Sequence, residues 1–386
     1  MRIGLFGFDF SSSNKGCEAL TYTFLSMMDR LCCQGELEVL NFTYNDSLGV
    51  IPEVYRTITF RRVKINLKNP RFLVNAIKQI KECDLFFDAT FGDGFSDIYG
   101  LKWNVKTDLI KQLVIWSGTP LILVPQTYGP YSSKILEHWA MHLIGRAGLV
   151  YSRDDASAEY VGRQSGKNIK IASDMAFKLP YDKDMYKLVP EKIHVGINVS
   201  SLLWDSEWAK ANHFGLTVDY KAYHYQLIVY LIQDARYAVH LIPHVIDIQT
   251  SDARENDNRT VQELKKRYGD AVIQAPAFRT PIEAKSYIAN MDVFIGARMH
   301  ATIAAISSGV ATIPFSYSRK FEGLYGNINY PYVVSARKES TEEALEKTIE
   351  WISEYNKLKE VGAPTVETAI NKLNVLEQDI SDLIKS

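Results

Sequence analysis

Basic residues are not in excess in this chain of 386 residues. Lysine and arginine number 44, aspartate and glutamate number 45, and the formal net charge is −1. General nucleic-acid binders carry a basic surplus, so this balance argues against that class. Hydrophobic residues make up 46% of the chain and charged residues 23%. This mixture is typical of a folded globular protein and excludes disorder as the main state.

Cysteine is scarce, and long apolar runs are missing. The cysteines are Cys17, Cys32, Cys33 and Cys83. Their spacing fits neither a disulfide framework nor a zinc site and predicts a reducing compartment. No stretch approaches the ~18–20 apolar residues of a membrane span, and no signal peptide precedes the first strand-like segment. We expect a cytoplasmic protein without stable membrane insertion, and we leave open peripheral contact at the inner face of the membrane.

Several signature motifs are absent as well. There is no GxGxxG dinucleotide fingerprint, no P-loop and no GxSxG nucleophile elbow. His138 and His142 lie four residues apart on a predicted helix. They lack an accompanying acidic motif such as HExxH, so we predict no metal site. The sequence gives no reason to expect a cofactor.

What is present is a repeated alternation of short apolar strands with helical patterns. The expected strands of the first half are 2–8, 37–43, 60–67, 84–90, 120–126 and 148–152, and the expected helices are 16–33, 70–83, 104–117 and 132–146. The expected strands of the second half are 193–199, 238–243, 271–275, 292–296 and 310–316, and the expected helices are 219–236, 259–268, 281–290, 299–308, 341–361 and 365–384. This order predicts an α/β fold with parallel sheets flanked by helices.

The chain is long enough for two domains. A polar segment with two prolines interrupts the alternation near its middle. We therefore predict a Rossmann-like domain over 1–180, a linker over 181–192 and a second Rossmann-like domain over 193–362. The terminal helix, 363–386, could pack back on the first domain. Two such domains would face a cleft, with ligand sites at the carboxyl ends of the strands.

The segment NKGCEAL follows the first predicted strand and opens a helix. Backbone amides at a helix start bind anions or sugar oxygens, and Lys15 adds a positive charge. Asn14, Lys15 and Glu18 are therefore candidate ligand contacts. A polar loop that ends in a helix cap explains the same residues equally well.

Polar segments also follow later strands of the first half. In FGDGFSD, glycines let the backbone approach a ligand, and Asp93 or Asp97 could act as a general base. Gln126 and Tyr128, in PQTYGP, could meet a sugar. Arg153, in YSRDDAS, can bind a carboxylate or phosphate in two-pronged fashion. The alternatives are a solvated turn for the acids, and for Arg153 an ion pair with Asp154 or Asp155.

The most informative segment is GARMHATIAA at 296–305, between a strand and an alanine-rich helix. Arg298 and His300 would lie at the amino end of that helix, where the dipole disfavours cations. An anionic ligand would resolve this conflict, and His300 can titrate near neutral pH. The alternative is a buried helix with one satisfied histidine. Lys320 and His244 follow neighbouring strands and join the candidates.

Taken together, these segments resemble the polysaccharide pyruvyl transferase family over nearly the whole chain. The most specific stretch is GARMHATIAAISSGVATIPFSYSRKFEGLY at 296–325. Supporting stretches are NKGCEAL, FGDGFSD, PQTYGP, YSRDDAS, SDMAF at 173–177 and IPH at 242–244. The chain departs from many relatives at Cys17, where they have an acidic residue, and at Gly92-Asp93-Gly94, where they have a run of glycines. Both departures lie in the half expected to bind the acceptor.

The resemblance implies a two-domain fold like that of GT-B glycosyltransferases. It also implies transfer of a pyruvyl group from phosphoenolpyruvate to a free or lipid-linked saccharide, forming a ketal and releasing phosphate, in cell-surface polysaccharide synthesis. We expect His300 as the acid and Asp93 or Asp97 as the base. The expected donor contacts are Arg153, Arg298, His300 and Lys320, and the expected acceptor contacts are Asn14, Lys15, Glu18, Gln126, Tyr128 and His244.

Two other functions fit the same residues. A nucleotide-sugar-dependent glycosyltransferase of this shape would use the helix terminus at Arg298 for a diphosphate. A non-catalytic saccharide-binding relative would bind a ligand without turnover, although the intact run Arg298-Met299-His300 argues against a decayed site. The acceptor sugar, its linkage and the oligomeric state are not encoded in any motif that we recognise.

Overall fold

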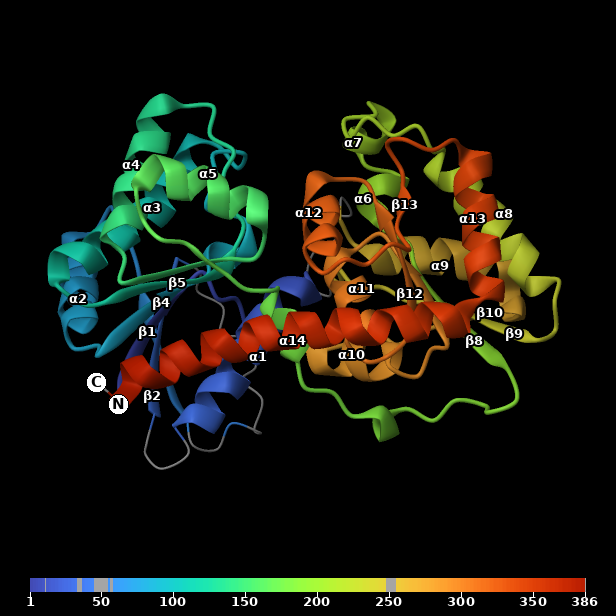
Figure 1. Ribbon diagram of the computed structural model, residues 1–386, viewed down its shortest axis with the longest axis horizontal. Helices are drawn as coiled ribbons and strands as arrows, with labels where there is room; N and C mark the ends of the chain where they lie inside the picture. The colour runs from blue at the N-terminus through green and yellow to red at the C-terminus, as the bar shows by residue number, and fades with distance from the viewer. Residues whose placement is uncertain (11, 33–36, 45–54, 56–57, 248–254, 386) are drawn as a thin grey trace. The chain divides into compact units, whose positions relative to one another are not determined.

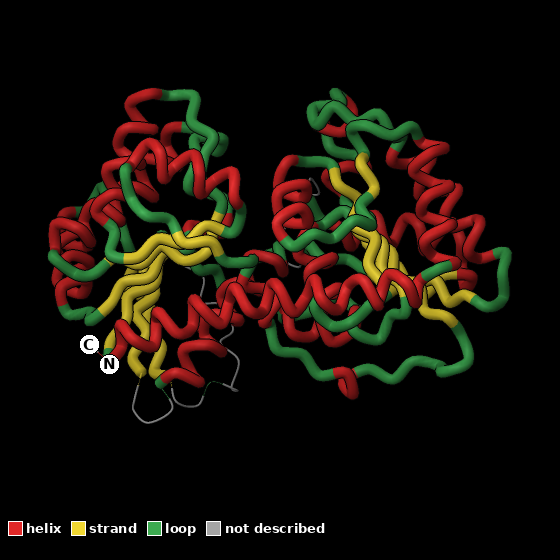
Figure 2. The backbone as a smooth tube through the Cα atoms, viewed as in Figure 1, coloured by secondary structure: helices red, strands yellow, loops and turns green. Residues whose placement is uncertain are grey.

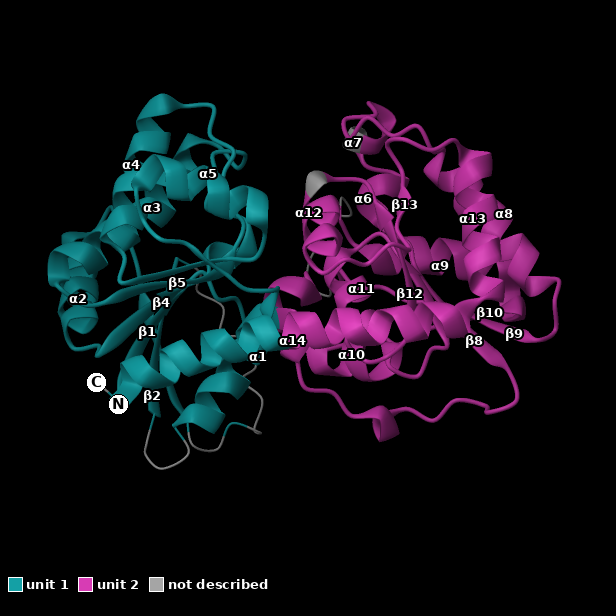
Figure 3. Ribbon diagram, viewed as in Figure 1, with its two compact units in different colours: residues 1–12, 20–175, 371–386 teal, residues 13–19, 176–370 magenta. Residues whose placement is uncertain are grey.

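The computed structural model describes residues 1–10, 12–32, 37–44, 55, 58–247 and 255–385. It divides into two compact units, which Figure 3 shows in two colours. Unit 1 comprises residues 1–12, 20–175 and 371–386, and unit 2 comprises residues 13–19 and 176–370. Cys33, the last residue of the helix predicted over 16–33, lies outside the described residues.

Unit 1 contains a parallel sheet whose described strands follow the order β3-β2-β1-β4-β5-β6-β7. The strands are drawn in yellow in Figure 2. Their bounds are β1 Arg2–Phe6, β2 Leu37–Thr43, β3 Ile58–Lys64, β4 Leu85–Asp88, β5 Leu121–Gln126, β6 Leu149–Ser152 and β7 Lys170–Ile171. Short runs of leucine, isoleucine, valine and phenylalanine form these strands because both faces of the sheet are covered.

Helices cover both faces of the unit 1 sheet (Figure 1). Their bounds are α1 Lys15–Leu31, α2 Pro70–Lys81, α3 Leu101–Ser117, α4 Lys134–Arg146, α5 Asp155–Ser165 and the last part of α14 Tyr355–Lys385. Arg30 of α1 pairs with Glu377 of α14 at 2.8 Å. Residues 371–386, from the helix predicted over 363–386, thus belong to unit 1.

Unit 2 repeats the same architecture with the strand order β10-β9-β8-β11-β12-β13. The strands are β8 Ile193–Asn198, β9 Tyr237–Leu241, β10 Val272–Gln274, β11 Val293–Gly296, β12 Ala311–Ser316 and β13 Val334–Ser335. The helices are α6 Ser201–Trp204, α7 Glu207–Lys210, α8 Tyr220–Ile232, α9 Asp257–Tyr268, α10 Pro281–Ile288, α11 Met299–Ile306, α12 Arg319–Asn327 and α13 Thr341–Ser353, with the first part of α14. The predicted α/β class with two parallel sheets flanked by helices is confirmed.

The two closing helices divide at a different place from the one that the sequence predicts. The break lies at Glu354, which ends α13, and Pro364 is inside α14. A proline within a helix removes one backbone hydrogen bond. Buried side chains recur along α14 on both sides of Pro364, among them Leu358, Ala369 and Leu373. Their burial outweighs the local preference for a break.

The segment that the sequence predicts as a linker, 181–192, lies against unit 2. The backbone N–H of Asp182 donates to Ser286 Oγ at 2.9 Å. Tyr186 and Leu188 pack against a core cluster of the same unit. This segment therefore packs on the unit instead of being an extended linker without contacts. The domain boundaries predicted from sequence stay predictions. None of the described helices is both long enough and apolar enough to cross a bilayer.

In each sheet the strand order reverses at one point, between β1 and β4 in unit 1 and between β8 and β11 in unit 2. Open parallel sheets bind ligands at the carboxyl ends of the strands beside such a reversal. The loops that follow β8, β9 and β11 are therefore the part of unit 2 that positions a site.

Candidate functional site

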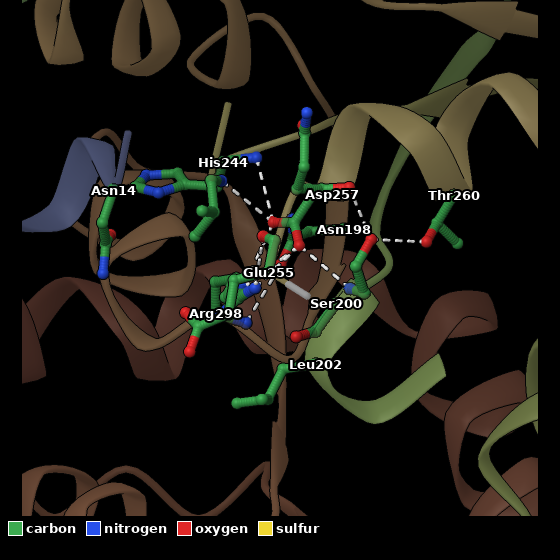
Figure 4. Close-up of polar contacts among 12 residues, drawn as sticks. Asn14, Asn198, Ser200, Leu202, His244, Glu255, Asp257, Thr260 and Arg298 are labelled. Atoms are coloured by element: carbon green, nitrogen blue, oxygen red, sulfur yellow. Dashed lines mark hydrogen bonds and ion pairs between the residues drawn. The ribbon is translucent and has the colours of Figure 1, made fainter. Parts of the chain in front are cut away.

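Arg298 lies at the strand reversal of unit 2, directly after β11. It is the N-cap residue of α11, and its backbone N–H donates to Asn198 Oδ1, at the end of β8, at 3.0 Å. Its guanidinium is buried and pairs with Asp257, with 2.9 Å between Nη2 and Oδ1. Figure 4 shows the two side chains pointing toward one another.

The counter-charge of Arg298 therefore comes from within the chain. The sequence led us to expect a cation at a helix terminus that only a ligand would balance. Asp257 lies 41 residues upstream, outside every segment that the sequence predicts to bear a site. The ion pair occupies Nε and Nη2 of Arg298, and Nη2 also donates to the carbonyl of Glu255 at 3.0 Å.

The first turn of α1 is part of unit 2. Asn14 forms an antiparallel bridge with Val245, and the N–H of Lys15 donates to the carbonyl of His244 at 3.1 Å. The side chain of Asn14 accepts the N–H of Gly16 at 2.9 Å and so caps the helix. These contacts hold the amino end of α1 beside the loop that follows β9.

His300 lies against this amino end. A Cβ placed on Gly16 would stand only 2.3 Å from His300 Nδ1 and 2.6 Å from its Cγ. Only glycine leaves room for the ring in this position. Because His300 is the second residue of α11, the amino ends of α1 and α11 meet at this contact. Both helix dipoles direct their positive ends toward the same region.

Lys15 adds a positive charge to this region, and His244 adds a buried imidazole. Lys15 is buried, and its ammonium bonds to Glu18 Oε2 at 2.7 Å and to the carbonyl of Arg279 at 3.0 Å. His244 is also buried, and burial holds the pKa of its imidazole well below the usual 6.5. The positive charges of His300, Arg298 and Lys15 lower this pKa further. His244 is therefore neutral at neutral pH.

We call Lys15, His244, Arg298 and His300, together with the amino ends of α1 and α11, the anion site. Several polar atoms at or after the ends of strands in the same sheet are buried without a hydrogen-bond partner among the described residues. They are His244 Nδ1, Ser200 Oγ after β8 and Ser316 Oγ at the end of β12. Buried polar atoms in folded proteins nearly always have a partner. A bound polar ligand or water would supply the missing partners.

Arg153 of unit 1 has a partner of the same kind as Arg298. Its Nη1 bonds to Asp174 Oδ2 at 2.8 Å, and its Nε bonds to Thr127 Oγ1 at 2.8 Å. Asp174 is fully buried. Asp154, the alternative partner, instead caps α5 by accepting the N–H of Ser157 at 2.7 Å.

The other predicted contacts of unit 1 take part in hydrogen bonds within that unit. Asp97 Oδ2 accepts the N–H groups of Ser132 and Ser133, which orders the turn before α4. The Tyr99 hydroxyl donates to Asp93 Oδ2 at 3.1 Å. Gln126 and Tyr128 are buried, and they donate to the carbonyls of Asp88 and Tyr151, respectively. Lys320, of unit 2, is the second residue of α12 and is partly buried.

A profile of the polysaccharide pyruvyl transferase family matches residues 14–319. The chain belongs to this family. The matched range holds every predicted site residue except Lys320, which follows its end directly. Membership makes the protein a transferase, specifically a polysaccharide pyruvyl transferase in the general sense of the family. Among curated proteins, no sequence match was found.

Solved structures of other proteins share the fold of this chain. UDP-GlcNAc 2-epimerase from Neisseria meningitidis has 9% identity and a TM-score of 0.61, over 100% of this chain and 99% of its own. HepE from Anabaena, solved in complex with UDP, has 15% identity and a TM-score of 0.56, over 100% of both chains. Sucrose-phosphate synthase from Thermosynechococcus elongatus has 11% identity and a TM-score of 0.55, over 100% of this chain and 98% of its own. These likenesses confirm the GT-B-like fold.

A buried cluster of charged residues in unit 1 was not predicted from the sequence. Lys111 of α3 is fully buried between Asp88 and Asp108, with its Nζ 3.5 and 3.6 Å from their carboxylate oxygens. Burial raises the pKa of Asp108 to about 6, although Lys111 opposes this shift. Asp88 also accepts a hydrogen bond from the hydroxyl of Thr90, in a loop where Thr90, Phe91 and Gly92 all have positive φ angles. Such strained loops concentrate at functional positions.

Within the part of the chain that the structure describes, no group of three or more His, Cys, Asp or Glu side chains is arranged to hold a metal ion.

Proposed function

We propose that this protein transfers the pyruvyl group of phosphoenolpyruvate to two hydroxyls of a saccharide, and that the donor binds at the anion site of unit 2. One observation carries the proposal. Two helix amino ends meet at His300 and Gly16, and Lys15, His244 and Arg298 lie around them. Phosphoenolpyruvate carries a phosphate and a carboxylate, and such a concentration of donors and positive potential favours both.

Each element of the anion site has a distinct use in binding this donor. The N–H groups at the start of α11 and the guanidinium of Arg298 can bind phosphate or carboxylate oxygens. His244 is neutral, so its ring can bind an oxygen by hydrogen bonding without adding charge. The hydroxyls of Ser200 and Ser316 offer further donors at the neighbouring strand ends.

Ketal formation begins with a proton. In the proposed reaction, His300 donates it to the methylene carbon of phosphoenolpyruvate, which leaves an oxocarbenium centre at the adjacent carbon. One saccharide hydroxyl attacks this carbon and loses its proton to a base. A second hydroxyl then replaces the phosphate at the same carbon: the carbon–oxygen bond to the phosphate breaks, and the proton of this hydroxyl passes to the leaving phosphate. Asp93 and Asp97 stay the sequence-based candidates for the base.

The other donor and acceptor contacts predicted from the sequence are also part of the proposal. We propose Arg153 and Lys320 as further donor contacts, and Gln126 and Tyr128 as acceptor contacts. The structure adds that Asn14, Lys15 and Glu18 belong to the same unit as His300. We therefore move Lys15 and His244 from the acceptor to the donor group, because the charges of Lys15 and His300 both act on His244. Asn14 and Glu18 stay proposed acceptor contacts.

The test is an activity assay with competing donors. Purified protein is incubated with phosphoenolpyruvate or with UDP-sugars, each against a panel of saccharides and lipid-linked saccharides. We expect phosphate release and a pyruvyl ketal from phosphoenolpyruvate alone. Sugar transfer from a UDP-sugar with phosphoenolpyruvate inert would favour a glycosyltransferase, and saccharide binding without either turnover would favour the non-catalytic relative.

A matched pair of variants links this activity to the anion site. His300→Gln keeps a hydrogen-bonding side chain but cannot supply the acid proton, so turnover should fall much more than donor affinity. His138→Gln makes the same change at an exposed position of α4 and should leave turnover at the parent level.

A further inference from the structure

Asp257 is a buried carboxylate that contacts Arg298 and His244 of the anion site, and no motif of the sequence singles it out. It is the first residue of α9 and is fully buried. Its oxygens accept hydrogen bonds from the loops that follow three neighbouring strands: β9, β8 and β11. Figure 4 shows these contacts converging on its side chain.

The contacts divide between the two oxygens. Oδ1 accepts the N–H of Ser201 at 3.0 Å and Nη2 of Arg298 at 2.9 Å. Oδ2 accepts the N–H groups of His244 and Val245 at 3.3 and 3.0 Å. Arg298 Nε lies 3.3 Å from Oδ1 and 3.2 Å from Oδ2. Every partner is a donor, so only a carboxylate, which accepts on both oxygens, satisfies all of them.

A carboxylate with these contacts does more than neutralise a charge. It ties the backbone at His244 and Val245 and the start of α6 to the guanidinium of Arg298. Arg153 of unit 1 repeats the arrangement, with fully buried Asp174 as its partner at 2.8 Å. Both arginines that the sequence assigns to the donor are thus held by a buried aspartate of their own unit.

We infer that Asp257 is a positioning residue of the anion site: it sets the place of Arg298 and of the His244 loop before any ligand binds. The inference rests on the proposed function for its link to phosphoenolpyruvate. Because Asp257 occupies the Nε and Nη2 side of the guanidinium, the ligand meets the Nη1 side. Among the ion pairs of the described residues, Nη1 meets one carboxylate, that of Glu255. The side chain of Glu255 is exposed, and its Oε2 lies 3.6 Å from Nη1.

This assignment predicts that Asp257→Asn breaks hydrogen bonds of the site and weakens donor binding. Whichever way the amide turns, its NH2 group faces at least two N–H donors, and those hydrogen bonds break. Donor KM should rise at least tenfold in the protein that remains folded. Arg298→Lys provides a second variant, because a single ammonium cannot both replace the two contacts to Asp257 and reach the Nη1 position. It should raise donor KM by a similar factor without disturbing the backbone contacts of Asp257.

Asp292→Asn is the matched control. Asp292 precedes β11 at the opposite end of the strand, accepts the N–H of His194 at 3.0 Å and pairs with Lys359 at 3.4 Å. It thus holds backbone and a cation in the same unit, away from the strand carboxyl ends. Its loss should lower the melting temperature but leave donor KM within twofold of the parent.

Amide hydrogen exchange supplies a readout that needs no substrate. In Asp257→Asn, peptides that contain Ser201 and His244–Val245 should exchange faster together, although they are far apart in sequence. In Asp292→Asn and Arg298→Lys, the same peptides should keep the parent's protection. If the parent neither binds nor turns over phosphoenolpyruvate, the proposed function fails while this exchange pattern still decides the positioning role.

Two results would overturn the inference. One is a folded Asp257→Asn protein with the parent's donor KM and unchanged exchange at Ser201 and His244–Val245. The other is an Arg298→Lys protein with the parent's donor KM, since charge alone would then suffice and the orientation imposed by Asp257 would be irrelevant. Should Asp257→Asn fail to fold, the Arg298→Lys result decides.

Discussion

Arg298 Nη2 lies 2.9 Å from Asp257 Oδ1, and both side chains are withdrawn from solvent within unit 2. Burial of an ion pair costs desolvation for both members, so the pair is stable only while each partner is present. The guanidinium of Arg298 thus binds Asp257 and, in our proposal, also binds phosphoenolpyruvate. This double role governs how substitutions at Arg298 affect stability and binding.

Arg298→Ala should destabilise the ligand-free protein by about 3–5 kcal/mol, because Asp257 would remain as an uncompensated buried charge. From the sequence alone one expects the opposite, relief of a cation at the positive end of a helix dipole. Urea unfolding of the parent and the variant measures the difference. The double variant Arg298→Ala with Asp257→Ala should lose less stability than the sum of the two single changes. Additive losses would show that the two side chains do not stabilise each other.

Gly16→Ala should reduce turnover while leaving the protein folded. The added methyl group would stand 2.3 Å from His300 Nδ1, so the imidazole must move away from the start of α1. We expect kcat to fall by at least tenfold, because a small displacement of a proton donor has a large effect on rate. Gly145→Ala is the control, since its methyl group would meet no atom closer than 3.5 Å. Parental kcat in Gly16→Ala would contradict the role of His300.

The pKa of His244 should respond to its neighbours in a defined direction. Burial and the charges of His300, Arg298 and Lys15 hold it below 6.5. Nuclear magnetic resonance should therefore show a neutral ring across neutral pH. Lys15→Met removes one of these charges and should raise the pKa, whereas Lys338→Met, at an exposed position of unit 2, should not. A His244 ring that titrates near 6.5 in the parent would contradict the placement of these charges.

The carboxyl of Asp108 predicts a pH dependence of stability. Its pKa is raised by burial to about 6 in the folded protein, against about 3.9 in an unfolded chain. Between these values the folded state binds the proton more tightly, so this group lowers stability as pH rises through the window and restores it as pH falls. At neutral pH the cost is about 3 kcal/mol at most.

Asp108→Asn removes this titration from the buried cluster around Lys111. The variant should be more stable than the parent at pH 7 and should lose the rise in stability between pH 6 and pH 4. Thermal unfolding across that range checks both points, with Asp155→Asn, an exposed residue of α5, as the control. A variant less stable than the parent at pH 7 would show that Asp108 is held ionised by Lys111.

Local sequence patterns account for the architecture and for part of the site. The apolar runs predict the strands that bear the functional loops within a few residues, because each run is buried on both faces of a sheet. The segments around Lys15, His244, Arg298 and His300 were recognisable because each follows a strand or opens a helix. Their gathering in unit 2 follows from the positions of β8, β9 and β11 in the sheet and of the first turn of α1 in the same unit.

Those local patterns do not predict which acidic residue pairs with which basic residue. Asp257 and Asp174 pair with arginines 41 and 21 residues away, and nothing in a local window distinguishes them from surface acids. Lys111 lies on a helix that the sequence predicts correctly, yet its side chain is fully buried. Which side of a helix faces the protein interior, and which charge meets which, depends on packing between segments distant in sequence.

The central claim is that phosphoenolpyruvate binds where the amino ends of α1 and α11 meet. A crystal structure of the protein soaked with phosphoenolpyruvate tests it most directly. We expect density for the donor beside His300, with oxygens in hydrogen-bond distance of Arg298 Nη1 and of the first N–H groups of α11, and with the Arg298–Asp257 pair intact. Donor density elsewhere in the protein, with this region empty at saturating ligand, would contradict the account.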